Sequence, residues 1–221
     1  MNKPIITIDG PSASGKGTLA KRLAQALGFY YLDTGAIYRL LALSLINAGT
    51  DPDDPRAAAA AASRLAAQFD PLLLENPRLR SDIVAGVSSK ASRHAGVRLA
   101  LLDIQRNLAT DPPRQYRGAV LDGRDTGTVV CPNAPLKIFL TADPAERALR
   151  RTKELQSRGI ETTYEAVLQD LEARDTRDAS RDVAPLKPAQ DAATVDTSAL
   201  DADAAFEHVL NLVRARFPDL A

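Results

Sequence analysis

Short apolar runs alternate with longer amphipathic stretches along most of this chain. The apolar runs are short and rich in β-branched residues, which is typical of buried strands, whereas apolar residues three and four positions apart predict helices. We expect strands at about 4–8, 29–32, 118–121, 136–140 and 194–196. We expect helices at about 19–27, 36–48, 54–68, 88–109, 143–159, 162–182 and 201–216, with a possible break at Gly96. This alternation predicts the α/β class, with an open, mainly parallel sheet and helices on both faces.

Several helix ends carry recognisable capping residues. Gly28 follows the last apolar position of the first helix, where a left-handed glycine commonly ends a helix. The expected amino-terminal caps are Asp33 or Thr34, Asp54 before Pro55, Asp143 before Pro144, and Thr162 in a capping box with Glu165. These signals support the helical assignments independently of the hydrophobic pattern.

The segment from about Phe69 to Val87 breaks the helical pattern. It contains two prolines and the short apolar run Leu72-Leu73-Leu74. Proline disfavours helix interiors, and a short apolar run is compatible with a strand. We therefore interpret this segment as a small insertion of strand and loop character.

Size and composition indicate a soluble globular protein. A chain of 221 residues with 45% hydrophobic content is long enough for one domain with a packed core. No apolar run approaches the roughly 20 residues that span a bilayer, and the amino terminus leads into the first strand without a signal-peptide pattern. We therefore expect the protein in the cytoplasm.

Charge and cysteine content exclude several classes of function. The 28 basic and 28 acidic residues give a formal net charge of zero, so no overall field attracts nucleic acid or a membrane. With one cysteine, Cys131, and two histidines, the chain offers neither a disulfide framework nor a zinc motif. Any specificity for anions must come from local groups of arginines.

The first strand is followed by a glycine-rich loop and then by a helical pattern. The loop reads Gly10-Pro11-Ser12-Ala13-Ser14-Gly15-Lys16-Gly17-Thr18. Glycines let several backbone N–H groups converge on a polyphosphate, the following helix adds its positive end, and a lysine reaches the β- and γ-phosphates. A structural turn with a chance lysine is the competing interpretation, but the flanking strand and helix favour phosphate binding.

The loop departs from the strict phosphate-loop pattern at one position. Gly17 occupies the place where a Ser or Thr normally binds Mg²⁺, and Thr18 follows one residue later. This Gly-Lys-Gly-Thr form resembles nucleoside monophosphate kinases more than GTPases or motor ATPases.

Arginines recur in four groups after the loop. Phosphoryl transfer between two nucleotides requires positive groups on the acceptor phosphate and on the group in transit. The groups are Arg39, Arg124, Arg150 with Arg151, and Arg174 with Arg177 and Arg181. The spacing in the last group predicts one helical face that also carries Asp178, although a solvated, salt-bridged face has the same pattern.

Four segments together resemble the bacterial cytidylate kinases, which phosphorylate CMP and dCMP with ATP. They are Ile8-Asp9-Gly10-Pro11-Ser12-Ala13-Ser14-Gly15-Lys16-Gly17-Thr18, Leu32-Asp33-Thr34-Gly35-Ala36-Ile37-Tyr38-Arg39, Leu121-Asp122-Gly123-Arg124-Asp125-Thr126-Gly127-Thr128-Val129-Val130, and the stretch from Arg174 to Leu186. They span nearly the whole chain in the family's order, which makes the resemblance far more specific than a phosphate loop alone.

The resemblance implies a role for each site residue. Cytosine offers an amino donor at N4 and acceptors at N3 and O2, so a carboxylate and an arginine would complement it. The matching positions for the base are Asp125 and Arg98, helped by Thr34 and Arg181. Those for the acceptor phosphate are Arg39 and Arg124; those for the sugar are Tyr38, Ser89, Arg174 and Asp178; and those for the lid over ATP are Arg150 and Arg151.

The resemblance also implies the cofactor and the catalytic set. ATP would bind the whole loop from Gly10 to Thr18, with Mg²⁺ contacted by Thr18 and water and with Asp122 as an indirect partner. The implied catalytic residues are Lys16, Asp122, Arg124, Arg150 and Arg151. We expect one nucleotide-kinase domain over 1–221, with an acceptor-closing insertion at about 65–95, a lid at about 150–170, and a monomeric enzyme that binds CMP or dCMP together with ATP.

Two alternatives and two departures remain. The chain could phosphorylate another small acceptor such as UMP, AMP or shikimate, or act as a non-catalytic nucleotide switch, although the Asn-Lys-x-Asp motif of GTPases is absent. Thr34 stands where the family usually has serine, which adds a methyl group near the base. The insertion from about Phe69 to Val87 is shorter than the long bacterial form, which bears on the shape of the acceptor-closing domain.

Overall fold

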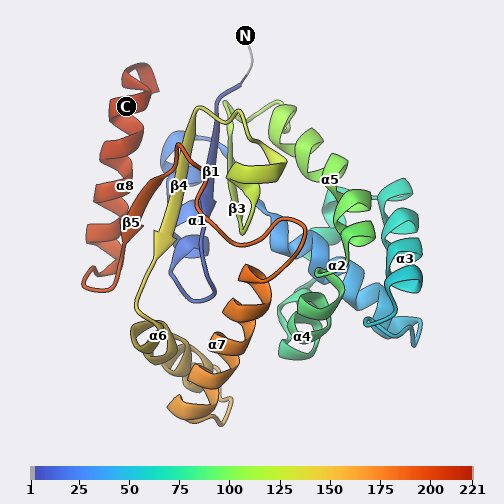
Figure 1. Ribbon diagram of the computed structural model, residues 1–221. Helices are drawn as coiled ribbons and strands as arrows, with labels where there is room; N and C mark the ends of the chain where they lie inside the picture. Colours follow the sequence, from blue (N-terminus) through green and yellow to red (C-terminus); the bar gives the residue numbers. More distant parts are fainter. Residues whose placement is uncertain (1–2, 221) are drawn as a thin grey trace. The chain divides into compact units, whose positions relative to one another are not determined.

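A computed structural model describes residues 3–220 and contains a five-stranded sheet in the order β2-β3-β1-β4-β5. The strands are β1 (Ile5–Asp9), β2 (Tyr30–Asp33), β3 (Ala119–Gly123), β4 (Leu136–Thr141) and β5 (Ala193–Asp196). The central β1 pairs in parallel with β3 and β4, and β4 pairs in parallel with β5 (Figure 1). All five predicted strands are present, and the predicted α/β class is confirmed.

Helices connect these strands. They are α1 (Lys16–Leu27), α2 (Thr34–Asn47), α3 (Pro55–Ala67), α4 (Asp82–Ala91), α5 (Ala95–Thr110), α6 (Pro144–Ser157), α7 (Tyr164–Ala179) and α8 (Ala202–Arg216). Short 3₁₀ turns occupy Pro71–Glu75, Pro77–Arg80 and Pro218–Leu220, and a π-helical turn occupies Thr126–Val130.

Most of the expected helix caps are confirmed. Gly28 adopts the left-handed conformation with φ 65°, and the Asp33 carboxylate accepts a hydrogen bond from the backbone N–H of Ala36. The expected capping box at Thr162 is wrong by one residue. Thr163 has the extended backbone of a cap, and its hydroxyl accepts from the N–H of Ala166, so α7 starts at Tyr164.

The expectation of strand and loop character for Phe69–Val87 is wrong. The two prolines begin consecutive 3₁₀ turns, because the side chains of Asp70 and Asn76 cap them, and α4 follows from Asp82. Leu79 and Val84 are buried in a cluster with α2, whereas Leu72 is exposed. The apolar positions therefore mark one side of irregular helical turns rather than a buried strand.

The helix expected at about 88–109, with a possible break at Gly96, is two helices. The chain leaves the helical conformation between α4 and α5, a few residues before the break expected at Gly96. A Cβ at Gly96 would lie 2.9 Å from the side chain of Ala59, so this glycine lets α5 pack closely against α3. Its purpose is close packing near the start of α5 rather than a break within it.

The hydrophobic core covers one face of the sheet. Ile6 and Ile8 of β1 are fully buried and pack with α1 and α8, which carry Leu23 and Val209 into the same cluster. Side chains alternate between the two faces of a strand. Thr7 and Asp9 of β1 therefore point to the opposite face, where the π-helical turn lies against Asp9.

The chain forms two compact units. The first comprises the residues up to Leu32 and those from Ala109 onward, and it holds the sheet with α1, α6, α7 and α8. The second, Asp33–Leu108, holds α2, α3 and α4, most of α5, and the segment at about 65–95 expected to close over the acceptor.

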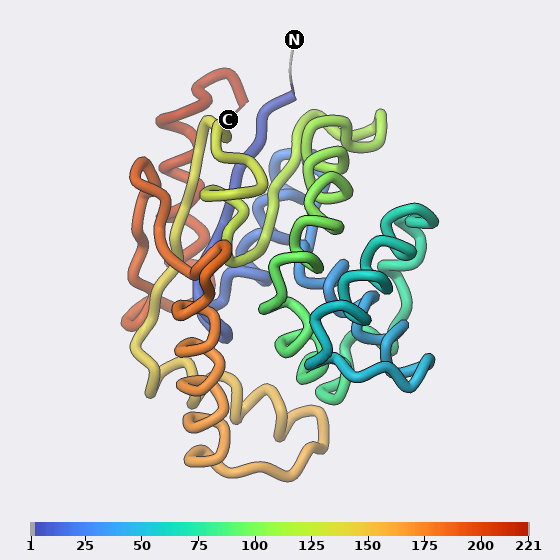
Figure 2. The backbone as a smooth tube through the Cα atoms, turned by 45° about the vertical axis from the view of Figure 1, so that its right-hand side comes forward, coloured from blue at the N-terminus to red at the C-terminus, as the bar shows by residue number. Residues whose placement is uncertain are grey.

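The expected lid segment at about 150–170 lies in α6 and α7. These consecutive helices pack through Ala148, Leu155, Val167 and Leu171 (Figure 2). Ala13 of the glycine-rich loop packs against the same cluster, so the α6–α7 pair contacts the loop directly. Within residues 3–220, no helix combines the length and apolar character needed to span a bilayer.

Candidate active site

The glycine-rich loop joins β1 to α1 through three left-handed residues. Gly10, Ala13 and Gly15 have φ values of 154°, 59° and 85°. At Gly10 no side chain fits, because a Cβ would lie 2.2 Å from the carbonyl oxygen of Leu140. Gly15 precedes the first turn of α1 and supplies no side-chain cap. The amides at this helix end are therefore not capped by the residue that precedes them, and they can meet an anion.

Lys16 and Ser14 present polar atoms at the same loop. The Lys16 side chain is buried, and its Nζ donates to the carbonyl oxygen of Pro11 at 3.0 Å. The Ser14 hydroxyl is buried and has no hydrogen-bond partner among residues 3–220. A buried hydroxyl without a partner is costly, so a phosphate oxygen is a fitting acceptor for it.

Asp122 lies against the start of α1. The hydroxyl of Tyr31 donates to Asp122 Oδ2 at 3.2 Å, and a Cβ at Gly17 would lie 3.0 Å from the same oxygen. A Ser or Thr side chain at position 17 would therefore crowd this carboxylate. Gly17 thus leaves room for the Asp122 carboxylate, and the hydroxyl nearest in the sequence is that of Thr18.

Arg124 connects the end of β3 to the loop and to α7. Its Nε donates to Asp178 Oδ2 at 3.0 Å, and its Nη2 donates to the Ser12 hydroxyl at 2.9 Å. Asp178 is only 2% exposed, and burial alone would raise its pKa. The guanidinium groups of Arg124, Arg181 and Arg174 outweigh burial and hold the pKa of Asp178 below its ordinary value. This carboxylate is therefore ionised at neutral pH.

The three arginines of the arginine-rich segment have different surroundings. Arg181, just beyond the helix, forms an ion pair with Asp178. Arg174 is half-buried and contributes to the same electrostatic cluster. Arg177 is exposed, and its Nε donates to the Ala173 carbonyl of its own helix. The structure thus joins Arg124, Arg174 and Arg181 around one buried carboxylate and leaves Arg177 outside.

Arg147 is a buried arginine that the sequence analysis did not select. Its Nη1 lies 2.6 Å from Asp175 Oδ2 and donates to the Ser12 carbonyl oxygen at 3.1 Å, and its Nε donates to the Ala142 carbonyl. It therefore ties α6, α7 and the loop together. Its position among several arginines of α6 gave no signal of this role, because the partners lie far along the chain.

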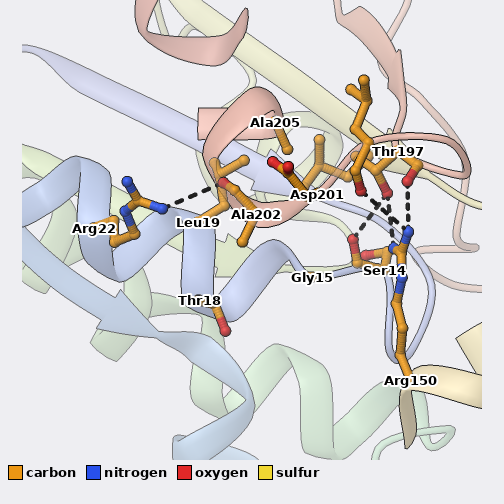
Figure 3. Close-up of a pocket in the computed structure, with 12 residues that line it drawn as sticks. Ser14, Gly15, Thr18, Leu19, Arg22, Arg150, Thr197, Asp201, Ala202 and Ala205 are labelled. Carbon is orange, nitrogen blue, oxygen red and sulfur yellow. Dashed lines mark hydrogen bonds between the residues drawn. The ribbon is translucent and has the colours of Figure 1, made fainter. Parts of the chain in front are cut away.

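Arg150 lines a pocket of about 210 Å³ beside the loop (Figure 3). Its guanidinium donates to the Thr197 carbonyl at 2.6 Å and to the Thr197 hydroxyl at 3.3 Å, and it reaches the Ser198 carbonyl. The Thr197 hydroxyl in turn donates to the Ser14 carbonyl at 3.3 Å. The resemblance implied that Arg150 belongs to the lid over ATP and to the catalytic set; here backbone carbonyls of the β5–α8 loop accept the hydrogen bonds of its guanidinium.

The rest of the pocket is mixed in character. Thr18, Leu19 and Arg22 of α1 and Ala205 of α8 line it (Figure 3). Leu200 adds a further apolar wall. Apolar walls with a few polar groups at the edge suit a flat heterocycle joined to a polar chain. Arg151 does not line this pocket and forms an ion pair with Glu154 at 2.7 Å.

Asp9 holds the turn that follows Asp125. Asp9 Oδ1 accepts from the backbone N–H of Thr126 at 2.9 Å and from its hydroxyl at 2.8 Å, and Oδ2 accepts from the N–H of Gly127 at 2.8 Å. Burial raises the pKa of Asp9 to about 6; these hydrogen bonds oppose the rise, and the charge of Asp125 adds to it. Asp125 is itself buried. No role for Asp9 followed from the sequence.

Asp33, Thr34 and Arg39 meet at the start of α2 in the second unit. Arg39 Nη2 donates to Asp33 Oδ2 at 2.5 Å, while Asp33 Oδ1 caps the helix. Thr34 is buried directly beside this cap. The ion pair holds the Arg39 guanidinium at the amino-terminal end of α2, where the helix dipole already favours an anion.

Arg98, Tyr38 and Ser89 also belong to the second unit. The Arg98 guanidinium lies over the ring of Tyr38 at 5.2 Å and donates to the Ser92 carbonyl at 3.2 Å. Gln105 Nε2 donates to the Tyr38 hydroxyl at 3.4 Å. The Ser89 hydroxyl is buried without a partner among residues 3–220. Arg98 and Tyr38 therefore form one packed group, and Ser89 keeps an unused hydroxyl.

Comparisons with known proteins point to one family. A family model described as cytidylate kinase matches residues 6–215. A cytidylate kinase from Paramagnetospirillum magneticum is 54% identical over 212 residues, covering 96% of this chain and 98% of that protein. A cytidylate kinase from Granulibacter bethesdensis is 48% identical over 214 residues, covering 97% and 98%. Among solved structures, an uncharacterized protein from Eubacterium ventriosum has the same fold, with a TM-score of 0.55 and 13% identity over 97% of this chain and 100% of that one.

Proposed function

Because the chain belongs to the cytidylate kinase family and transfers a phosphoryl group from ATP to CMP or dCMP, we propose specific roles for its residues in the two nucleotide sites. The products are ADP and CDP or dCDP. The observation that carries the proposal is the loop Gly10–Gly15, which has left-handed backbone, an uncapped helix end and a buried lysine directly after it.

The donor site is built on this loop. The triphosphate of ATP accepts hydrogen bonds from the loop amides and from the Ser14 hydroxyl, which otherwise has no partner among the described residues. Lys16 exchanges its contact with the Pro11 carbonyl for the β- and γ-phosphates. The pocket bordered by Arg22 and Arg150 receives the nucleoside of ATP, because it adjoins the loop and has apolar walls.

The acceptor site uses two arginines for the phosphate and a carboxylate with an arginine for the base. Arg39 and Arg124 bind the phosphate of CMP. Asp125 accepts from the N4 amino group of cytosine, and Arg98 donates to N3 and O2. Uracil would present its O4 acceptor to the Asp125 carboxylate, so the same site disfavours UMP.

Sugar recognition and lid closure complete the proposal. Tyr38, Ser89, Arg174 and Asp178 contact the sugar, and Thr34 and Arg181 support the base. The Ser89 hydroxyl has no partner within residues 3–220, which leaves it available for a sugar hydroxyl. Arg151 and the α6–α7 segment act as the lid over ATP. Within a single nucleotide-kinase domain over 1–221, the segment at about 65–95 closes over the acceptor.

The residues beside the loop fit Mg²⁺ bound together with ATP. The oxygen donors there are the Thr18 hydroxyl and the Asp122 carboxylate, and Mg²⁺ prefers oxygen ligands. Residues 3–220 contain no cluster of three or more His, Cys, Asp or Glu side chains that could hold a metal alone. Thr18 would contact the ion, Asp122 would orient its water ligands, and the ion would neutralise charge on the β- and γ-phosphates.

Catalysis then rests on position and charge. The acceptor phosphate is already an anion, so its oxygen attacks without a general base. Lys16 and Arg124 stabilise the charge on the group in transit, and the loop amides keep the donor phosphates fixed. Asp178 holds Arg124 by an ion pair, which limits its motion before the acceptor binds. No covalent intermediate is formed with the protein.

An acceptor screen tests this proposal. ADP formation is measured with ATP and Mg²⁺ and with CMP, dCMP, UMP, AMP or shikimate as acceptor. CMP and dCMP should be preferred over UMP by at least about tenfold in kcat/KM, because UMP loses the bond to Asp125 and sets a carbonyl acceptor against its carboxylate. Equal rates with UMP would refute the role of Asp125. Hydrolysis of ATP that no acceptor stimulates would favour a nucleotide switch.

A matched pair of variants makes the screen specific. Asp125→Asn removes the charge of the proposed base reader, while Asp103→Asn makes the same change on the exposed surface of α5. The first should reduce the preference for CMP over UMP, and the second should leave it unchanged. We also propose a monomer that acts in the cytoplasm; sedimentation of the purified enzyme and cell fractionation test these two points.

A further inference from the structure

Asp9 is a buried carboxylate whose hydrogen bonds all lead to one turn. It ends β1, immediately before the loop, yet its side chain lies on the sheet face opposite the main core. Oδ1 accepts from the N–H and hydroxyl of Thr126, and Oδ2 accepts from the N–H of Gly127, at distances of 2.8 to 2.9 Å. The carboxylate is 4% exposed. Asp9 therefore serves the turn at 126–127 rather than a ligand of the loop.

The turn fixes the Asp125 carbonyl and the two residues that follow it. The Asp125 carbonyl oxygen accepts from the N–H groups of Val129 at 2.9 Å and Val130 at 3.2 Å. The two residues after Asp125 donate their N–H groups to Asp9. The amides at the start of a helical turn have no partner inside the turn, so Asp9 satisfies the two that would otherwise be buried without one.

Packing restricts movement of this turn toward the sheet. A Cβ at Gly127 would lie 2.8 Å from Thr7 Oγ1, 3.3 Å from Lys137 Cδ and 3.4 Å from Asp9 Oδ2. The backbone of Gly127 thus lies directly on β1 and β4. Loss of the Asp9 carboxylate would leave the N–H groups of Thr126 and Gly127 without their acceptor. The turn could then relax only away from the sheet.

We infer that Asp9 is a positioning residue for acceptor selection: by holding the amides of Thr126 and Gly127, it sets the direction in which Asp125 presents its carboxylate to the base. This inference rests on the proposed role of Asp125 in reading cytosine. Asp9 does not touch either nucleotide in this scheme. Its effect should therefore appear in the affinity for CMP and in the preference over UMP, not in the handling of ATP.

Thr126 provides a graded test of the same contact. Thr126→Val removes the hydroxyl that donates to Asp9 and keeps the shape of the side chain, while Thr126→Ser keeps the hydroxyl. Asp9→Asn is the stronger change, because one carboxylate oxygen that accepts a hydrogen bond becomes an amide nitrogen. That nitrogen is a donor and would face a backbone N–H, which is also a donor. Asp125→Asn serves as the reference for direct loss of base recognition.

The experiment is steady-state kinetics with CMP, UMP and ATP varied separately. Asp9→Asn should raise KM for CMP by about tenfold and lower the CMP-to-UMP ratio of kcat/KM, with KM for ATP within about twofold of the original. Thr126→Val should shift the same quantities by about two- to fivefold, and Thr126→Ser should restore them.

Each other outcome has a defined meaning. If Asp125→Asn lowers the CMP preference but Asp9→Asn and Thr126→Val do not, the inference is overturned and the proposed function stands. If Asp125→Asn leaves the preference intact, the proposed base reader is wrong. If the Asp9 variant weakens ATP and CMP equally, Asp9 supports the loop instead, which also overturns the inference. If the Asp9→Asn protein does not fold, the two Thr126 variants decide. Identical KM values for CMP in Thr126→Val and Thr126→Ser overturn the inference, and a higher KM for CMP in Thr126→Val supports it.

Discussion

Replacement of Asp9 by Asn should change how the stability of this protein depends on pH. Burial raises the pKa of Asp9 from 3.8 to about 6, against the opposing hydrogen bonds from Gly127 and Thr126 and with a further contribution from the charge of Asp125. The folded protein therefore keeps a proton on Asp9 at pH values where the unfolded chain has lost it. An Asn side chain has no such titration.

The sign and size of the effect follow from this difference in pKa. Between about pH 3.8 and pH 6 the unfolded state binds fewer protons at this site, so the contribution of Asp9 to the free energy of unfolding falls as pH rises. The fall amounts to about 3 kcal/mol, because a difference of about 2.2 between the two pKa values is multiplied by about 1.36 kcal/mol. Below pH 3.8 the contribution is complete, and above about pH 7 it is absent.

The measurement is urea unfolding of both proteins at intervals from pH 4 to 7.5. The free energy of unfolding of Asp9→Asn minus that of the original protein should increase with pH by about 3 kcal/mol and then level off near pH 7. Carboxylates that do not interact with Asp9 cancel in the subtraction. Asp103→Asn, on the exposed face of α5, is the control and should show no comparable slope. A difference that is constant across this range, or that decreases with pH, would refute the reasoning.

Three further predictions concern the loop, the turn and the pocket. Lys16→Met should lower kcat by roughly 10²- to 10³-fold with an unchanged melting temperature, whereas Lys21→Met on the exposed side of α1 should keep the original kcat. A normal kcat for Lys16→Met would remove the phosphate-loop assignment. Gly127→Ala should lower the free energy of unfolding by about 1–3 kcal/mol, because its Cβ would lie 2.8 Å from a β1 hydroxyl. Gly86→Ala, which has open space in α4, should raise it by about 0.5–1 kcal/mol, and equal unfolding midpoints in denaturant would contradict this difference. Arg150→Met should raise KM for ATP about tenfold with KM for CMP unchanged, because the β5–α8 loop loses its hydrogen bonds to the Arg150 guanidinium. A fall in kcat alone would instead support direct contact between Arg150 and the transferring phosphate.

Local sequence patterns predicted most of the fold for a simple reason. A strand is recognised from a few consecutive residues, and a cap such as Asp33 or Gly28 acts within three or four positions of itself. The prediction was wrong at Phe69–Val87 because apolar residues there pack against α2 from irregular turns. Neither the 3₁₀ turns nor the packing partner leaves a regular period in the sequence.

The candidate site was predicted unevenly. Lys16 and its loop follow directly from the order of strand, glycines and helix. The pairing of Arg124 with Asp178 could not be predicted, because the two residues are 54 positions apart. The sequence pattern of a charged helical face is also the same whether that face is solvated or buried. Arg150 was assigned to the lid and the catalytic set, and no local pattern indicated that its guanidinium donates to carbonyls of the β5–α8 loop.

The sequence by itself determined the α/β class, the phosphate loop and the identity of the chemical groups, because these depend on short-range geometry and on residue type. Only the tertiary structure decided which charges are buried together and which backbone amides a carboxylate holds. Asp9 and Thr126 are separated by 117 positions, and no local pattern records a contact of that range. Burial and distance set the pKa of Asp9, and both arise only when the chain has packed.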